Sequence, residues 1–288
     1  MSLVIDKVED FIIQIAHPSI PDESECATSR GNCCWLLTPR QHAIDALLYP
    51  PIMVAIGFTF FYLHKQFRTK AHVVAHKKYA KECERYPLAI TVFVCALYIT
   101  YFAQRAQPEE MWRLVWFLAP CNLTALFICI ASTVSSSTAR YNWTRYNNLY
   151  AVFVMAPLFM PDLRNLPMAE IVVFYLVHAA VPLFTLYSIY TRRVRPSEES
   201  WLLVMAVAFF SLPIQSSIQT FASFTVGANV NYMLHPPPGF HWAGEQFKWM
   251  GFACSAVAFV VGHLWCLMWE KIFSSIGFAP AHAKQHGA

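Results

Sequence analysis

The sequence from Met168 to Tyr190 reads MAEIVVFYLVHAAVPLFTLYSIY, with Glu170 as its one charged residue. A helix needs about 17 to 25 mostly apolar residues to cross the hydrocarbon core of a membrane, so this segment is predicted to span it. Similar apolar runs occupy residues 43–64, 87–104, 112–134, 147–161, 201–226 and 249–270. The fourth of these runs is the shortest and has loop-forming residues on both sides. The sequence therefore predicts an all-α polytopic integral membrane protein with about seven transmembrane helices.

The composition explains why lipid must cover part of this chain. Apolar residues make up 57% of the 288 residues and charged residues only 13%, against roughly 25% charged residues in a soluble domain. There are too few polar residues to coat a soluble globule of this size. The aromatic content of 16% excludes a disordered chain, and the nine cysteines are spread too widely for a small disulfide framework. The excess apolar surface is therefore expected to face a membrane.

Basic residues are distributed unequally between the two sides that seven helices would create. Of the 21 Lys and Arg residues, 14 fall in the first, third and fifth connectors and the C-terminal end. Because short cytoplasmic loops are enriched in Lys and Arg, the N-terminus is predicted to be lumenal and the C-terminus cytosolic. The predicted organisation is a lumenal segment 1–42, a single transmembrane domain 43–272 with a basic cytosolic connector 65–86, and a cytosolic tail 273–288.

The predicted lumenal segment begins with acidic residues, so no cleaved signal peptide is expected. It carries three cysteines, Cys26, Cys33 and Cys34. In an oxidising lumen they allow one disulfide and leave one thiol over, and the sequence does not select the pair. The basic connector suits either a segment lying on an anionic membrane surface or a solvated loop. His72 and His76 lie one helical turn apart, but without a third ligand nearby no metal site is predicted.

Polar side chains inside a bilayer are costly, so those within the predicted spans are the first functional candidates. Cys121 lies nine residues after Trp112, and His178 lies ten residues after Met168. If both helices start on the lumenal side, the two side chains reach depths of ~13 Å and ~15 Å. A thiol is a weak nucleophile at neutral pH unless a base takes its proton. A thiol and an imidazole at one depth are therefore the minimum constellation for nucleophilic catalysis.

Structural explanations of the same residues remain open. A buried cysteine is often an apolar filler, and His178 would equally serve as a structural histidine bonded to a neighbouring helix, as is favoured for His263. Pro120, the residue before the thiol, is predicted to kink its helix and open the backbone toward a cavity. Arg113 and Glu170, near the lumenal ends of their helices, would either form an ion pair or extend separately to water.

Several short segments resemble the transmembrane protein 164 family. These are LAPCNL at 118–123, LPMAEI at 166–171 continuing to YLVHAAVP at 175–182, NVNYMLHP at 229–236, and Gly262-His263. Their order and spacing agree with the family over most of the chain, and the family's Cys and His motifs fall on Cys121 and His178. The chain departs from the vertebrate members at Asn122, where they carry His.

This resemblance implies an acyltransferase without a cofactor, in an endoplasmic reticulum or Golgi membrane. Such an enzyme takes a polyunsaturated acyl chain from a diacyl phospholipid and places it on a lyso-ether phosphatidylethanolamine. The expected partners are therefore membrane phospholipids, and no nucleic acid or metal is expected. A seven-helix receptor would share the topology, but Ala139 stands where the receptor Asp-Arg-Tyr triplet has its acid. A transporter would predict an inverted repeat, and none is found.

The residues and the resemblance together predict a double-displacement reaction. His178 accepts the proton of Cys121, the thiolate attacks the donor ester to form a thioester, and His178 then activates the acceptor hydroxyl. The side-chain amide of Asn122 or main-chain N–H groups next to Pro120 are the candidate donors for the oxyanion. Asn231 and Gln219 are the candidates for orienting the imidazole.

Overall fold

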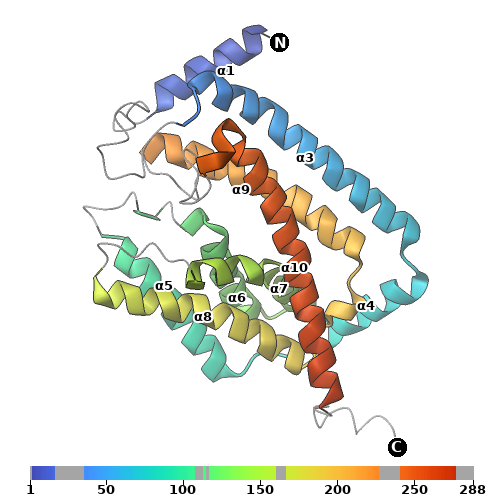
Figure 1. Cartoon of the computed structure of the whole chain (residues 1–288). Coiled ribbons are helices and arrows are strands. Elements are labelled where there is room, and N and C mark those ends of the chain that lie inside the picture. Colours follow the sequence, from blue (N-terminus) through green and yellow to red (C-terminus); the bar gives the residue numbers. More distant parts are fainter. Residues whose placement is uncertain are drawn as a thin grey trace, which may run out of the picture. The chain divides into compact units, whose positions relative to one another are not determined.

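The computed structural model describes residues 2–16, 36–107, 113–114, 117–159, 167–226 and 241–276, and every regular element within these ranges is a helix (Figure 1). The α-helices are α1 (Ser2–Ile15), α3 (Pro39–Phe67), α4 (Lys70–Glu82), α5 (Leu88–Arg105), α6 (Pro120–Thr133), α7 (Ser137–Phe159), α8 (Met168–Tyr190), α9 (Trp201–Val226) and α10 (Phe247–Ser275). Two short 3₁₀ helices, η2 (Pro196–Glu198) and η4 (His241–Gln246), precede α9 and α10. The predicted all-α class is confirmed for the described residues.

Five described helices, α3, α5, α8, α9 and α10, are long and apolar enough to cross a membrane. Two of the seven predicted spans do not reach this standard. Helix α6 has 14 residues, which extend over ~21 Å, short of a hydrocarbon core of about 30 Å. Helix α7 begins at Ser137 rather than Asn147 and includes the polar residues that the sequence assigned to a loop. The orientation of the termini stays a prediction.

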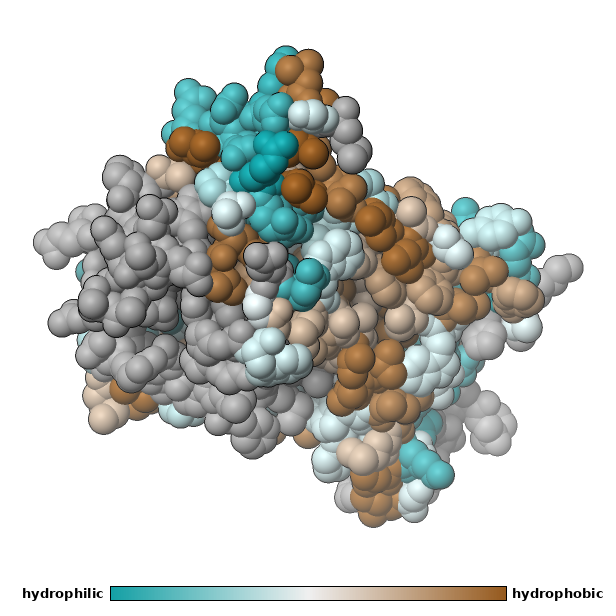
Figure 2. All heavy atoms as spheres, turned by 45° about the horizontal axis from the view of Figure 1, so that its top comes forward, coloured by the Kyte–Doolittle hydropathy of each residue, from teal (hydrophilic) through white to brown (hydrophobic). Residues whose placement is uncertain are grey.

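Lipid-facing surface is visible on these helices. Phe58 of α3 and Leu183 of α8 are 61% and 64% exposed. Figure 2 shows apolar side chains over much of the face that it presents, with polar side chains gathered in separate groups. Exposed apolar side chains on long apolar helices are what an integral membrane protein requires, because lipid removes them from water.

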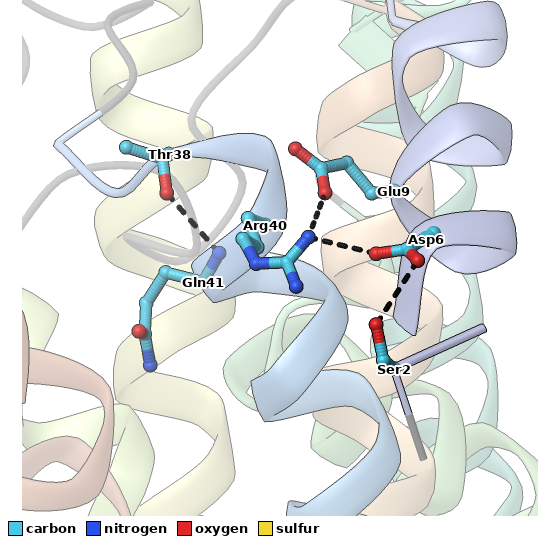
Figure 3. A network of polar contacts seen from close by, with 6 residues as sticks. All are labelled: Ser2, Asp6, Glu9, Thr38, Arg40 and Gln41. Atoms are coloured by element: carbon cyan, nitrogen blue, oxygen red, sulfur yellow. Dashed lines mark hydrogen bonds and ion pairs between the residues drawn. The ribbon is translucent and has the colours of Figure 1, made fainter. Parts of the chain in front are cut away.

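The chain forms two compact units, one of residues 1–62, 112–119 and 205–257 and the other of residues 63–111, 120–204 and 258–288. In the first unit α1 packs through Ile12 against Ala43 of α3 and Phe224 of α9. Arg40 lies between two carboxylates of α1, with Nη1 2.8 Å from Asp6 and 3.0 Å from Glu9 (Figure 3). These contacts attach the N-terminal helix to α3.

Helices α5 to α8 form the bundle of the second unit, and α6 and α8 run in the same direction within it. The Tyr86 hydroxyl bonds both Thr144 of α7 and Ser188 of α8, and Asn147 of α7 donates to Thr185 of α8. The earlier residue of α7 pairs with the later residue of α8 and the later with the earlier, so these two helices are antiparallel. Only three residues separate α6 from α7, so this pair is a hairpin. The parallel course of α6 and α8 that the predicted catalytic pair needs is therefore present.

The basic connector contains helix α4, and its contact with a membrane surface stays a prediction. His76 faces α7, where its Nε2 lies 3.2 Å from Nη1 of Arg145 and its ring meets Tyr141 edge-on. Lys77 and Lys78 are exposed. Burial lowers the pKa of His76, and the neighbouring Arg145 charge adds to this effect.

Candidate active site

Cys121 is the second residue of helix α6, which begins at Pro120. Proline is favoured at the first helical position because its missing N–H would have had no partner there. The described residues just before it are not α-helical, since Phe117 and Leu118 lie in a 3₁₀ turn and Ala119 in a bend. The prediction of a kink at Pro120 inside a longer helix is therefore wrong, and the depth of ~13 Å that was measured along that helix no longer applies.

The position at a helix N-terminus gives Cys121 a specific electrostatic setting. The first N–H groups of a helix have no acceptor within the helix and form the positive end of its dipole. The main-chain N–H of Cys121 and that of Asn122 are among these first N–H groups, next to the side chain of Cys121. These donors favour negative charge on the sulfur and on an oxygen bound next to it. Burial opposes that charge, so a base is still required to take the proton.

His178 is buried in α8 and held in one orientation by its own helix. Its Nδ1 lies 2.7 Å from the carbonyl oxygen of Phe174, and the Phe174 ring stacks on the imidazole with 3.9 Å between centroids. A carbonyl only accepts, so Nδ1 donates, and in the neutral ring Nε2 carries the lone pair. The buried Nε2 has no hydrogen-bond partner among the described residues. This main-chain carbonyl therefore orients the imidazole from within its own helix.

Gln219 belongs to the first unit and Asn231 lies outside the described residues, so the orienting role of either one stays a prediction. Within the first unit, the side-chain amide of Gln219 donates to the carbonyl oxygen of Leu118 over 2.6 Å. The cysteines Cys26, Cys33 and Cys34 also lie outside the described residues. Arg113 belongs to the first unit and Glu170 to the second, so their ion pair stays a prediction.

Two residues that the sequence did not single out complete the polar surroundings of the pair. Arg105, at the end of α5, is close enough for its charge to act on both Cys121 and His178. Its guanidinium lies 4.7 Å from the ring centre of Tyr101, and the Tyr101 hydroxyl is hydrogen-bonded by the Asn122 side chain. The sequence could have indicated these two residues. They are four positions apart at the end of an apolar run, which places both on one helix face.

A shallow apolar groove, open to the outside, is lined by residues of α5, α6 and α8. Ala125 and Ile128 line it from α6, and Val177 and Val181 from α8. These positions lie within one or two turns of Cys121 and His178 on the same helices. The second unit thus combines a thiol, an unpartnered imidazole nitrogen and an apolar groove.

His263 is not part of this cluster. It lines another small pocket of the second unit together with Arg145, Glu199 and Asn148. Its ring meets Trp201 edge-on, with 4.4 Å between centroids. This packing agrees with the structural role favoured for His263.

The sequence is similar to known proteins over most of its length. A sequence model of the TMEM164 family matches residues 36–269. A protein of Dictyostelium discoideum described as "Transmembrane protein 164 homolog" is 26% identical over 194 residues, which cover 65% of this chain and 67% of that protein. No solved structure matches the chain. Because the family match covers most of the sequence and includes α3 to α9, the chain belongs to the TMEM164 family.

Proposed function

We propose that the protein is a membrane acyltransferase that moves a polyunsaturated fatty acyl chain from a phospholipid donor to a lyso-ether phospholipid, through a thioester on Cys121. The observation that carries the proposal is the position of Cys121 at the start of α6, beside a helix that holds the unpartnered Nε2 of His178. The resemblance of the sequence to the family supports the choice of donor and ether-lipid acceptor.

The first half-reaction loads the acyl chain onto the enzyme. Nε2 of His178 takes the proton of the Cys121 thiol, and the thiolate attacks the ester carbonyl carbon of the donor. The carbon–oxygen bond of the tetrahedral intermediate then breaks. The leaving lysophospholipid oxygen receives the proton from the imidazolium, and the acyl chain stays on sulfur as a thioester.

The second half-reaction reverses these roles. Nε2 of His178 takes the proton of the acceptor hydroxyl, whose oxygen attacks the thioester carbonyl. The Cys121 sulfur leaves and regains a proton from the imidazolium. In both steps a negative oxygen forms next to the sulfur, where the first N–H groups of α6 are available as donors. The Asn122 side chain bonds Tyr101, and the second N–H of its amide stays a candidate donor beside the main chain.

The proposal is tested with the purified full chain in lipid nanodiscs. A diacyl phosphatidylcholine carrying a deuterated arachidonoyl chain is supplied with lyso-ether phosphatidylethanolamine, and lipids and peptides are analysed by mass spectrometry. We expect the deuterated chain on the ether lipid and, when the acceptor is omitted, as a hydroxylamine-sensitive adduct on the peptide that contains Cys121. Absence of both products under conditions where the protein remains folded contradicts the proposed activity.

A further inference from the structure

The helix faces that surround Cys121 and His178 change from polar to apolar along their length. On α5, Arg105 and Tyr101 belong to the same face as Tyr98 and Val94, since the intervals of four, three and four residues repeat the period of a helix. Tyr98 and Val94 line the apolar groove, whereas Arg105 lies over the Tyr101 ring and its charge acts on Cys121 and His178. One face of α5 is therefore polar beside the reacting groups and apolar beyond them.

Helix α6 shows the same change. Cys121, Ala125 and Ile128 are separated by four and three residues and share one face. Ala125 lies ~6 Å and Ile128 ~10 Å along the axis from the thiol-bearing residue. On α8, Val181 follows His178 by three residues, and Ala180 and Val177 complete the wall on this side. The groove thus starts about one helical turn from the proposed nucleophile and continues away from it.

We propose that this groove holds the acyl chain while it is bound to Cys121, and that Ala180, Leu97 and Ile128 determine which chain lengths are accepted. This inference rests on the proposed acyl transfer and adds the position of the chain. The occupant follows from the position of the groove, whose lining on α6 begins at Ala125, one helical turn after Cys121. An acyl group on the sulfur extends from the polar end, and the groove is the apolar surface that follows on the same face of α6.

The chemistry of the groove suits this occupant. Its described lining contains apolar side chains and Tyr98, without a charged residue. Removing methylene groups from water is favourable, and the charged Arg105 at the polar end suits the headgroup region of a lipid. A thioester bound in this way also has its carbonyl at the start of α6, where the main-chain N–H groups are available.

The test fills the groove and measures the length of the bound chain. The full-length protein in nanodiscs is incubated with an equimolar mixture of lauroyl, palmitoyl and arachidonoyl phospholipids, without acceptor, and the adducts on Cys121 are quantified by mass spectrometry. Ala180→Phe places a ring in the groove from α8. We expect the ratio of lauroyl to arachidonoyl thioester to rise by about tenfold, since overpacking costs of 1–3 kcal/mol correspond to factors of roughly 5 to 150.

Ala179→Phe is the matched control, because it introduces the same ring one residue away, where the helix turns it off the groove wall. Leu97→Phe tests the opposite wall, on α5, and is expected to shift the ratio in the same direction as Ala180→Phe. Leu97→Ala enlarges the groove and is expected to favour the longer chains. These two variants keep the test valid if the variant at position 180 does not accumulate.

The results separate this inference from the proposed function. Acylation of Cys121 with the same chain distribution in wild type, Ala180→Phe and the Leu97 variants overturns the assignment of the groove while leaving acyl transfer intact. An equal shift in Ala179→Phe overturns it as well. A wild-type protein that acquires no chain at Cys121 from any of the donors instead contradicts the thioester mechanism.

Discussion

Nδ1 of His178 lies 2.7 Å from the carbonyl oxygen of Phe174, one helical turn earlier in α8. This bond fixes the tautomer of the neutral imidazole, because a carbonyl can only accept. It also directs the basic nitrogen, Nε2, away from its own helix backbone. Nε2 of His178 is buried and has no hydrogen-bond partner among the described residues, so its lone pair is available to take a proton.

The base is tested by His178→Ala. We expect the variant to accumulate in the membrane at near-normal levels and to transfer acyl chains more slowly by roughly 10²- to 10⁴-fold, the usual contribution of a general base. His263→Ala is the matched control, since it removes a buried histidine of the same unit that lies outside the cluster, and it should keep its transfer rate per folded molecule. Loss of His178→Ala protein from the membrane, rather than of activity, would point to a structural histidine.

The nucleophile is tested by Cys121→Ala and by Cys129→Ala on the same helix. Cys129 donates to the carbonyl oxygen of Val94 over 3.6 Å and lies two turns further along α6. A thiol-reactive phospholipid analogue should label wild type and Cys129→Ala and should miss Cys121→Ala. Acyl transfer should follow the same pattern, because an alanine cannot carry the thioester. Full activity in Cys121→Ala would exclude this mechanism.

Cys121 and His178 could be selected from the sequence because each is a reactive group in an otherwise apolar run. The start of α6 could not be predicted. A proline that begins a helix and a proline that kinks one look alike in a sequence when both lie among apolar residues. The extent of α7 was missed for a different reason. Its polar side chains, such as Thr144 and Asn147, form hydrogen bonds with Tyr86 and Thr185 in other segments, and such long-range pairs leave no local pattern.

The contact between α1 and α3 is expected to depend on charge. The Arg40 guanidinium lowers the pKa of Asp6 below its usual range, so the stability that this pair contributes is present above an ordinary pKa near 3.9 and is lost as the pH falls through the lower folded value. Arg40→Gln removes the partner at neutral pH. We expect faster proteolytic cleavage within residues 2–16 of the variant, and of wild type in high salt, because exposed ion pairs are screened. Lys7→Gln, which neutralises a cation outside this network, should cleave like wild type.

The packing of α4 on α7 is expected to weaken in mild acid. Burial and the Arg145 charge lower the pKa of His76, so the neutral ring stabilises the folded state above its ordinary pKa near 6.5, and this contribution is lost as the pH falls through the folded value. Protonation would place two cations side by side, next to Tyr141 and with His64 nearby. Thermal unfolding of wild type and of His76→Gln, whose amide oxygen still accepts from Arg145, should coincide at pH 7.5 and diverge toward pH 5.5, with wild type less stable. Parallel curves over this range would exclude His76 as the titrating group.

The ends of α6 and α8 that point away from Cys121 are expected to lie on one side of the membrane. Arg140, at the start of α7, donates to the carbonyl oxygen of Cys83, and Arg193, just after α8, donates to that of Arg85. Both connectors are therefore tied to the same short segment between α4 and α5. The excess of Lys and Arg in these connectors predicts that this side is the cytosol.

Single cysteines at Ser136 and Ser197, in a background without other reactive cysteines, test this arrangement with a membrane-impermeant thiol reagent. Both positions are exposed, and Ser197→Cys keeps the main-chain bond that Ser197 donates to Glu270. We expect both to react from the cytosolic side only. Labelling of both from the lumen would preserve the parallel course of α6 and α8 and reverse the predicted orientation. Labelling from opposite sides would contradict the fold of the second unit, because Arg140 and Arg193 could not then bind neighbouring carbonyls of one segment.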